Sequence, residues 1–276
     1  MNSTPFRIAR PLAMLGAIGA TLIGLSAGSS RALAGETNRQ EAWNWSGALA
    51  SGQRLEINGV NGEIVAEPGT GDRVEVVADK HGKRDDPANV RIKVDQDSHG
   101  ITICAVYPGK SSPCEKAHLS FGISGRANDV EVNFHVKVPA GVAFVANNEN
   151  GAVRAHGLTG PVKAHTVNGE CELETAGACE ASTVNGSVHA TLGRLAARDK
   201  LDFSTVNGSI TLALPAATDA DVSCSTVNGD VKSDFPATTA GHFGPRHVTA
   251  TVGRGGAKVS ASTVNGSIRL QRANAQ

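Results

Sequence analysis

The stretch Ser-Thr-Val-Asn-Gly-Ser-Ile at residues 204–210 decides the fold, because close copies of it recur along the second half of the chain. Thr-Val-Asn-Gly occurs five times, with its asparagine at positions 168, 185, 207, 228 and 265. A weaker copy, Glu-Asn-Gly, stands at 149–151, and Val-Asn-Gly stands alone at 60–62. From Asn150 the successive spacings are 18, 17, 22, 21 and 37 residues, the last being close to two units with one degenerate. A repeat this short does not suit helix-pair or propeller units.

The residues that flank each Asn-Gly alternate between apolar and polar. The positions six and four before the asparagine, and three and five after it, are apolar or thiol in every full copy except at Ser233. These inward positions are Val162, Ala164, Cys171, Leu173, Cys179, Ala181, Val188, Ala190, Leu201, Phe203, Ile210, Leu212, Val222, Cys224, Val231, Val259, Ala261, Ile268 and Leu270. Such period-two alternation predicts strands with one buried face on both sides of each Asn-Gly.

Each Asn-Gly is expected to form a tight corner, because Gly adopts positive φ freely and Asn tolerates it better than most residues. The predicted corners are Asn150, Gly151, Asn168, Gly169, Asn185, Gly186, Asn207, Gly208, Asn228, Gly229, Asn265 and Gly266. Two architectures fit them. In a meander each corner closes a type I′ hairpin, and in a solenoid equivalent residues of successive coils stack in register.

The repeated columns favour the solenoid, because stacked asparagine amides form a hydrogen-bonded ladder at a spacing of about 4.8 Å. We therefore predict an all-β fold, a single-stranded, parallel, right-handed β-solenoid with repeats of 17–22 residues. Asn168, Asn185, Asn207 and Asn228 are expected to stack in one ladder.

The chain before the repeats keeps strand patterning, at 54–57, 73–76, 90–94 and 130–136, with turn residues between these runs. We interpret 35–145 as the irregular start of the same sheet system and 146–272 as the coils, within one domain at 35–276. A separate sandwich for the first half is the alternative. Only 193–200 has a helical pattern, and it is expected to form a turn inserted between coils.

The first 34 residues have the pattern of an export signal. Arg7 and Arg10 precede an apolar stretch at 12–25, and Ala-Leu-Ala at 32–34 fits a cleavage site. The apolar stretch is shorter than the roughly 20 residues that span a bilayer, which favours a cleaved signal over the alternative, a retained anchor. Cleavage after Ala34 would leave a chain with no transmembrane span and a formal charge of −3, in the periplasm, on the cell surface or outside the cell.

Export allows disulfides, and the chain has five cysteines. Cys104 and Cys114 bracket a segment with Pro108, Gly109 and Pro113, as a bridge across a loop would. A Cys104–Cys114 disulfide and two unpaired thiols both fit this spacing. The spacings match neither a zinc ribbon nor a Cys-x-x-Cys redox motif.

The Ser-Thr-Val-Asn-Gly-Ser-Ile copies resemble those of a bacterial exported family of unknown function, labelled "putative adhesin" and also called the toastrack domain. Val-Pro-Ala-Gly at 138–141, Leu-Pro-Ala at 214–216 and Thr-Val-Gly-Arg-Gly-Gly-Ala at 251–257 extend the resemblance over nearly all of the predicted mature chain. It implies a β-strand-repeat solenoid at the cell envelope. It implies nothing specific about activity.

Composition and motifs argue against several functions. With 26 basic and 26 acidic residues the chain lacks the positive charge that nucleic-acid binding requires. No zinc-protease, nucleophile-elbow or nucleotide-binding pattern is present, so we expect no catalytic residue, no metal and no cofactor. The outward serines 182, 204, 225 and 262 form a hydroxyl row that, on the sequence alone, has no base beside it.

Three functional hypotheses follow. The first is a non-enzymatic envelope protein that presents a regular β face to a glycan or a surface protein. The alternatives are a carbohydrate-active enzyme on a β-helix and an accessory protein of envelope-stress signalling. Binding is expected on the outward strand faces or on the irregular segment 233–256, which holds His242, Phe243, Arg246 and His247. A degenerate coil with a surface loop is the other interpretation of that segment.

Overall fold

The computed structural model describes residues 39–109, 114, 128–240 and 246–273. All of them belong to one compact unit, Glu36–Gln276. The predicted export signal at 1–34, with its cleavage site, lies outside the described residues.

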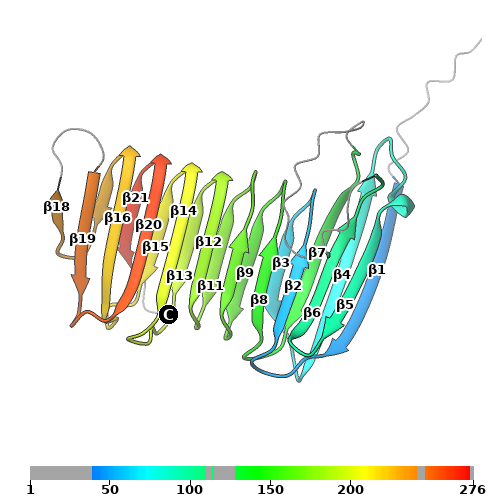
Figure 1. Cartoon of the computed structure of the whole chain (residues 1–276), viewed down its shortest axis with the longest axis horizontal. Coiled ribbons are helices and arrows are strands. Elements are labelled where there is room, and N and C mark those ends of the chain that lie inside the picture. Colours follow the sequence, from blue (N-terminus) through cyan, green and yellow to red (C-terminus); the bar gives the residue numbers. More distant parts are fainter. Residues whose placement is uncertain (1–38, 110–113, 115–127, 241–245, 274–276) are drawn as a thin grey trace, which may run out of the picture. The chain divides into compact units, whose positions relative to one another are not determined.

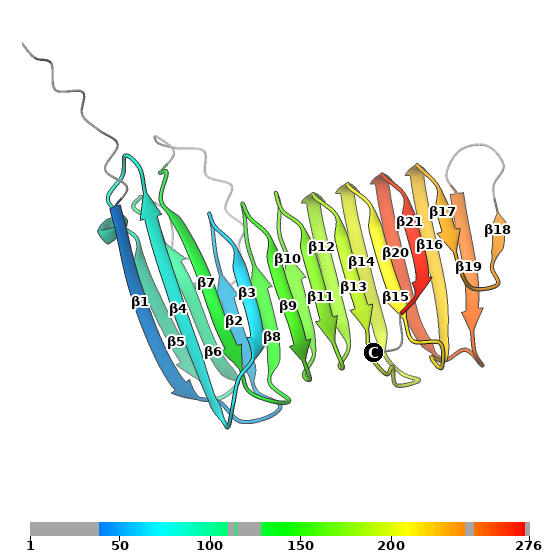
Figure 2. The same cartoon turned by 180° about the vertical axis from the view of Figure 1, so that it is seen from behind.

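The described residues form two large sheets (Figures 1 and 2). Sheet A has the order β1 (Arg39–Ala48), β4 (Arg73–Gly82), β7 (Glu131–Val138), β3 (Ile64–Pro68), β9 (Val153–Leu158), β11 (Cys171–Thr175), β13 (Val188–Leu192), β15 (Ile210–Leu214), β21 (Ile268–Arg272) and β17 (Val231–Ser233). Sheet B has the order β18 (Thr238–Ala240), β19 (Arg246–Val252), β16 (Ala220–Asn228), β20 (Ala257–Asn265), β14 (Lys200–Asn207), β12 (Cys179–Asn185), β10 (Val162–His165), β8 (Ala143–Asn147), β2 (Arg54–Asn58), β6 (Gly100–Val106) and β5 (Arg91–Asp97).

Each coil contributes one strand to each sheet, with the Asn-Gly corner between them. Strands β10, β12, β14, β20 and β16 pair in parallel in sheet B, and β11, β13, β15, β21 and β17 pair in parallel in sheet A. The all-β, parallel solenoid predicted from the repeat is therefore confirmed, and the hairpin meander is wrong.

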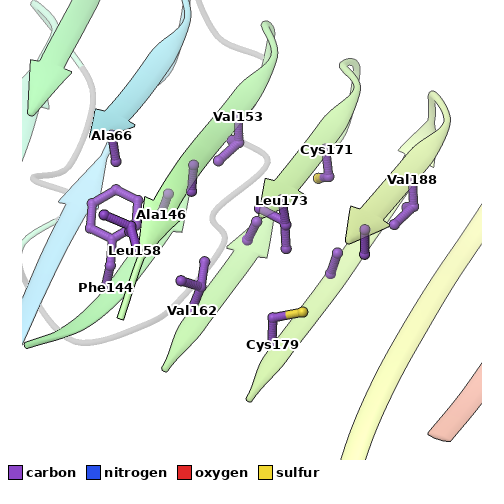
Figure 3. Close-up of a cluster of buried hydrophobic side chains, with 14 of the residues drawn as sticks. Ala66, Phe144, Ala146, Val153, Leu158, Val162, Cys171, Leu173, Cys179 and Val188 are labelled. Carbon is purple, nitrogen blue, oxygen red and sulfur yellow. The ribbon is translucent and has the colours of Figure 1, made fainter. Parts of the chain in front are cut away.

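The inward side chains of both sheets form one buried hydrophobic cluster (Figure 3). All the predicted inward positions are buried except Val231 and Ser233, which are half-buried on β17. The largest fully buried side chains include Phe134, Phe144 and Phe203. The period-two pattern thus identified the core correctly.

The first half of the chain continues these same sheets. Strands β1, β4, β7 and β3 extend sheet A beyond β9, and β2, β6 and β5 extend sheet B beyond β8. The described strands of the first half therefore belong to the same two sheets as the coils and do not form a separate sandwich. The helical pattern at 193–200 gives a loop and turn between β13 and β14, without a helix. The one helical turn among the described residues is η1 (Pro87–Asn89).

Antiparallel strands lie toward both ends of the sheets. Strands β1, β4 and β7 pair antiparallel in sheet A, as β5 and β6 do in sheet B. At the opposite end β19 pairs antiparallel with both β16 and β18. Repeat proteins need atypical terminal units because a regular last coil would offer an open template for aggregation.

The strand order departs from the sequence order at the last coil. Strands β20 and β21 lie between the coil β14–β15 and the coil β16–β17, so Asn265 stands between Asn207 and Asn228 in the ladder (Figures 1 and 2). The spacing of 37 residues before Asn265 is not two coils with one degenerate. It holds the antiparallel strands β18 and β19, which lead the chain back into the solenoid.

The reason for glycine at most corners is close approach of the backbone and not positive φ. Gly151 has φ +138°, but Gly169, Gly186, Gly208, Gly229 and Gly266 do not adopt positive φ. A Cβ on Gly186 would lie 1.9 Å from the carbonyl oxygen of Gly169, and one on Gly208 would lie 1.9 Å from that of Gly186. The expectation of a left-handed corner is therefore wrong at these five positions.

Asparagine and threonine link the coils through hydrogen bonds. Each corner asparagine donates from Nδ2 to the Oδ1 of its neighbour at 2.8–3.0 Å, along the order Asn61, Asn150, Asn168, Asn185, Asn207, Asn265 and Asn228. The corner threonines are buried, and Thr205 Oγ1 donates to the Gly186 carbonyl oxygen at 2.9 Å. The predicted ladder is confirmed, with the corrected order, and threonine satisfies glycine carbonyls that the strands leave unpaired.

Candidate functional site

The outer face of sheet B is the most regular surface of the solenoid. Outward residues from adjacent strands stand side by side in rows, because the strands pair in register. The first row is Lys200, Lys258, Asp221 and Thr251, the second is Asp202, Ser260, Ser223 and Thr249, and the third is Ser204, Ser262, Ser225 and His247. In each row the four residues belong in turn to β14, β20, β16 and β19.

A row of valines lies on the same face, next to the asparagine ladder. Val184, Val206, Val264 and Val227 are 40–48 % exposed, and the described residues have no other large hydrophobic side chain as exposed as these. Threonine, asparagine and glycine in the repeated motif each have a contact between coils that accounts for them. The valine side chain is exposed, so packing inside the protein does not account for it. Its recurrence therefore makes this row a candidate contact surface.

Beyond Ser204, the third row continues across β12 to a histidine on β10. His165 on β10 is paired with Ser182 on β12, which in turn is paired with Ser204. His165 Nδ1 lies 2.6 Å from Ser182 Oγ. The inference that no base stands beside the serine row is therefore wrong for Ser182, and histidines occupy both ends of the row.

The Ser182–His165 pair lacks the surroundings of an acyl-transfer site. Catalysis by such a pair needs hydrogen-bond donors aimed at a developing oxyanion. Ser182 lies inside a parallel strand that is paired on both sides, so the nearby backbone N–H groups serve the sheet. The contact is better explained as a hydrogen bond across the strands.

We expect His165 to make the protein less stable in mild acid. Burial of the ring is the main cause that lowers the pKa of His165, and Lys163 lowers it further while Glu180 opposes the shift. The pKa of His165 is therefore lower in the folded protein than in the unfolded chain, where it is about 6.5. The stability that the neutral ring allows is complete above pH 6.5 and is lost as the pH falls through the folded pKa. Urea unfolding of His165→Gln at pH 7.5, 6.5 and 5.5 should therefore show a smaller loss of stability than wild type. Equal losses in both proteins would contradict this.

A shallow groove of about 620 Å³ crosses the strands below the serine row. Its walls come from the first two rows together with Glu180 of β12, and the residues between these rows, Leu201, Val222, Ala250 and Val259, also line it. Ser260 and Ser223 are short, whereas Lys200, Lys258 and Asp202 around them are longer and exposed, and this difference in length makes the surface hollow. No sequence pattern marked this groove, because its strands are adjacent only in the observed order.

The cysteines do not form a reactive or metal-binding group. Cys104 and Cys114 are joined by a disulfide with a Cα–Cα distance of 5.8 Å. Burial raises the pKa of the Cys171 and Cys179 thiols to about 12 and that of Cys224 to about 11, so all three stay protonated at neutral pH. Among the described residues no cluster of His, Cys, Asp and Glu is arranged to hold a metal ion.

Within the irregular segment 233–256, the described strands β18 and β19 extend sheet B in antiparallel pairing and do not form a coil. Arg246 pairs with Asp230, and His247 stands beside Ser225 on β19. His242 and Phe243 lie outside the described residues. The turn that follows is held by Asp219, whose carboxylate accepts hydrogen bonds from Arg254 N at 2.8 Å and Arg254 Nη2 at 2.9 Å.

The comparison with protein families agrees with the coils. Residues 146–271 match the family described as Toastrack DUF4097. This is the family that the Ser-Thr-Val-Asn-Gly copies resemble, and the match covers the coils. In the parts of the chain that the structure describes, no helix is long and apolar enough to cross a bilayer.

Solved structures of remote similarity have the same general description. A "putative cell adhesion protein" of Clostridium sporogenes is 11 % identical, with a TM-score of 0.44 over 84 % of this chain and 100 % of that one. A "putative adhesin" of Bacteroides fragilis is 12 % identical, with a TM-score of 0.27 over 83 % and 96 % of the two chains. No curated protein matches the chain. Likenesses as remote as these do not define a function.

Proposed function

We propose that the protein is an exported, non-enzymatic binding scaffold of the cell envelope, and that its outer sheet B face contacts an envelope glycan or a surface protein. One observation carries the proposal. Valine and serine recur on this face at the same positions of successive coils, and apart from the contact between Ser182 and His165 no described side-chain hydrogen bond between coils requires them there. A rigid solenoid keeps such a face flat and periodic, which suits an extended partner.

Export is the second part of the proposal, and it is supported by the basic start, the apolar stretch and the Ala-Leu-Ala sequence at 32–34. The domain then comprises 35–276, with the irregular start at 35–145 and the coils at 146–272. Protein recovered from the envelope fraction should begin at Gly35 in amino-terminal sequencing. An intact Met1 would contradict export by cleavage.

The binding surface can be tested with two variants of one coil. Ser204 on β14 and Thr211 on β15 are both half-buried, but they face outward from opposite sheets. Ser204→Arg places a long charged side chain in the middle of the serine row, and Thr211→Arg places the same side chain on sheet A. In pull-downs with washed cell envelopes, we expect Ser204→Arg to lose most of the binding and Thr211→Arg to keep it. Equal binding by both variants would remove sheet B as the contact face.

A glycan-hydrolysing enzyme is a second candidate, favoured by Glu180 and Asp202, which both line the groove. Glycoside hydrolysis uses a pair of carboxyl groups, one of which donates a proton. Here Glu180 accepts a hydrogen bond from Lys163 Nζ at 2.9 Å, so one carboxylate already has an ion-pair partner. Release of reducing ends from envelope polysaccharide by the purified protein would favour this candidate over the scaffold.

A further inference from the structure

The groove on sheet B contains polar side chains that have no partner in the fold. Lys200 and Lys258 stand directly opposite each other on β14 and β20, a placement in which two like charges repel. Neither ammonium group forms an ion pair with another described residue. Asp202, on the second row, likewise has no hydrogen bond or ion pair within the described part of the chain. Lys258 has Asp221 opposite it on β16, but on β20 no opposite charge stands across from Lys200 or Asp202, so pairing between strands does not explain these two groups.

Asp221 is the exception within the groove. Its carboxylate accepts hydrogen bonds from Thr251 Oγ1 and from the Gly256 backbone N–H, both at 3.2 Å. These contacts link β16 to β19 and to the turn before β20, and they hold the Asp221 side chain in place. The remaining groups are thus arranged on a rigid sheet, with their orientation set by the strands.

The charges of the groove select the chemistry of a ligand. Two lysines, two aspartates and Glu180 face it, so an anion and a cation would each meet side chains of both signs. Sugar hydroxyl groups both donate and accept hydrogen bonds, and they can therefore bind ammonium groups and carboxylates in the same site. Hydrogen bonds to charged groups are the stronger ones. No aromatic residue lines the groove, so recognition must come from many such bonds along an extended chain.

The direction of the groove also favours an extended ligand. It runs across β14, β20, β16 and β19, and adjacent strands are about 4.8 Å apart. A sugar chain laid in this direction meets a new pair of polar side chains at each strand. A chain linked β-1,4 is a straight ribbon in which each sugar advances by a length close to this spacing.

We propose that the groove binds an uncharged, β-1,4-linked glycan laid across these four strands. This inference rests on the proposed function, to which it adds the class of ligand and the place where it binds. Asp202 accepts hydrogen bonds from the sugar hydroxyls, Lys200 and Lys258 donate to their oxygens, and Ser260 and Ser223 form the floor beneath the chain.

The test is calorimetric titration of the mature chain, 35–276, with chitohexaose, chitobiose and polygalacturonate. Chitohexaose should bind at least about 10-fold more tightly than chitobiose, because it reaches more of the rows. Asp202→Ala and Lys258→Met should each weaken chitohexaose binding about 10-fold, as expected for loss of one charged hydrogen bond. Lys232→Met, which removes a lysine from the outer face of sheet A, is the matched control and should bind as wild type does.

Three results would overturn the inference: no binding of chitohexaose, equal affinities in the groove variants and wild type, or stronger binding of polygalacturonate than of chitohexaose. The last result would assign the groove to an acidic polymer. If envelopes still bind in a manner that depends on Ser204 while chitohexaose does not bind, the glycan inference fails and the proposed function stands. If neither the serine-row variant nor the groove variants lose envelope binding, both the glycan inference and the proposed function fail.

Discussion

Gly208→Ala should destabilise the protein by about 3 kcal/mol or more, as a forced overpacking against an atom that cannot move aside. An added Cβ would lie 1.9 Å from the carbonyl oxygen and 2.5 Å from the carbonyl carbon of Gly186. Both atoms belong to the backbone of the neighbouring coil. The only relief is to separate the two coils, which would also lengthen the bond from Asn207 Nδ2 to Asn185 Oδ1, now 2.9 Å.

The control for this variant is Gly71→Asn. Gly71 has φ +74°, an added Cβ there would have no other atom within 4 Å, and asparagine tolerates that backbone conformation. Urea unfolding should show a cost below about 1 kcal/mol for Gly71→Asn. A similarly small cost for Gly208→Ala would mean that the coils are not held as close as the structure shows.

The core could be predicted from the sequence because burial on one face of a strand leaves a period of two. That signal is local, and it correctly identified inward residues as different as Cys179 and Phe203. The reason why glycine is needed at the corners could not be predicted from the sequence. Positive φ and close approach both require glycine, and only the contact between Gly208 and the Gly186 carbonyl distinguishes them.

The strand order could not be predicted from the repeat alone. Strands β16 and β20 have nearly the same columns, so either could pair with β14 at similar energy. One difference was visible: the coil that ends in Val231 and Ser233 is less apolar than the one that ends in Ile268 and Leu270. The structure places β17, with Ser233, at the edge of sheet A, where burial is incomplete, and it places Leu270 between two strands. Ser233, the one polar residue in an otherwise apolar column, thus indicated which coil lies at the edge of the sheet.

Part of the candidate site could also be predicted from the sequence. Aligning the copies on asparagine places His165 in the column of Ser182, so their contact at 2.6 Å could have been found from the sequence. The groove could not, because Lys200 and Lys258 are 58 residues apart and become neighbours only when the last coil enters between β14 and β16. Binding surfaces on solenoids depend on which coils are adjacent, and this order is a property of the whole chain.

One column of buried residues in the core combines small side chains with one large side chain, Phe203. At the position four before each asparagine, Phe203 on β14 lies between Ala181 on β12 and Ala261 on β20. All three are buried, and Phe203 is fully inaccessible. The small neighbours leave the space that the phenyl ring fills, and they have no atoms that could move into it if the ring were removed.

Phe203→Ala should therefore cost roughly 3–5 kcal/mol, at the level of buried phenylalanines whose cavity does not collapse. The matched control is Val206→Ala on the same strand, which removes an exposed side chain from the opposite face and should cost below about 0.5 kcal/mol. Urea unfolding of both variants at pH 7.5 gives the two free energies of unfolding. A cost below about 1 kcal/mol for Phe203→Ala would show that the ring does not fill the interior of the coil. Because the variant leaves the outer face of β14 unchanged, its folded fraction should still bind envelopes, which separates the role of the core from that of the contact surface.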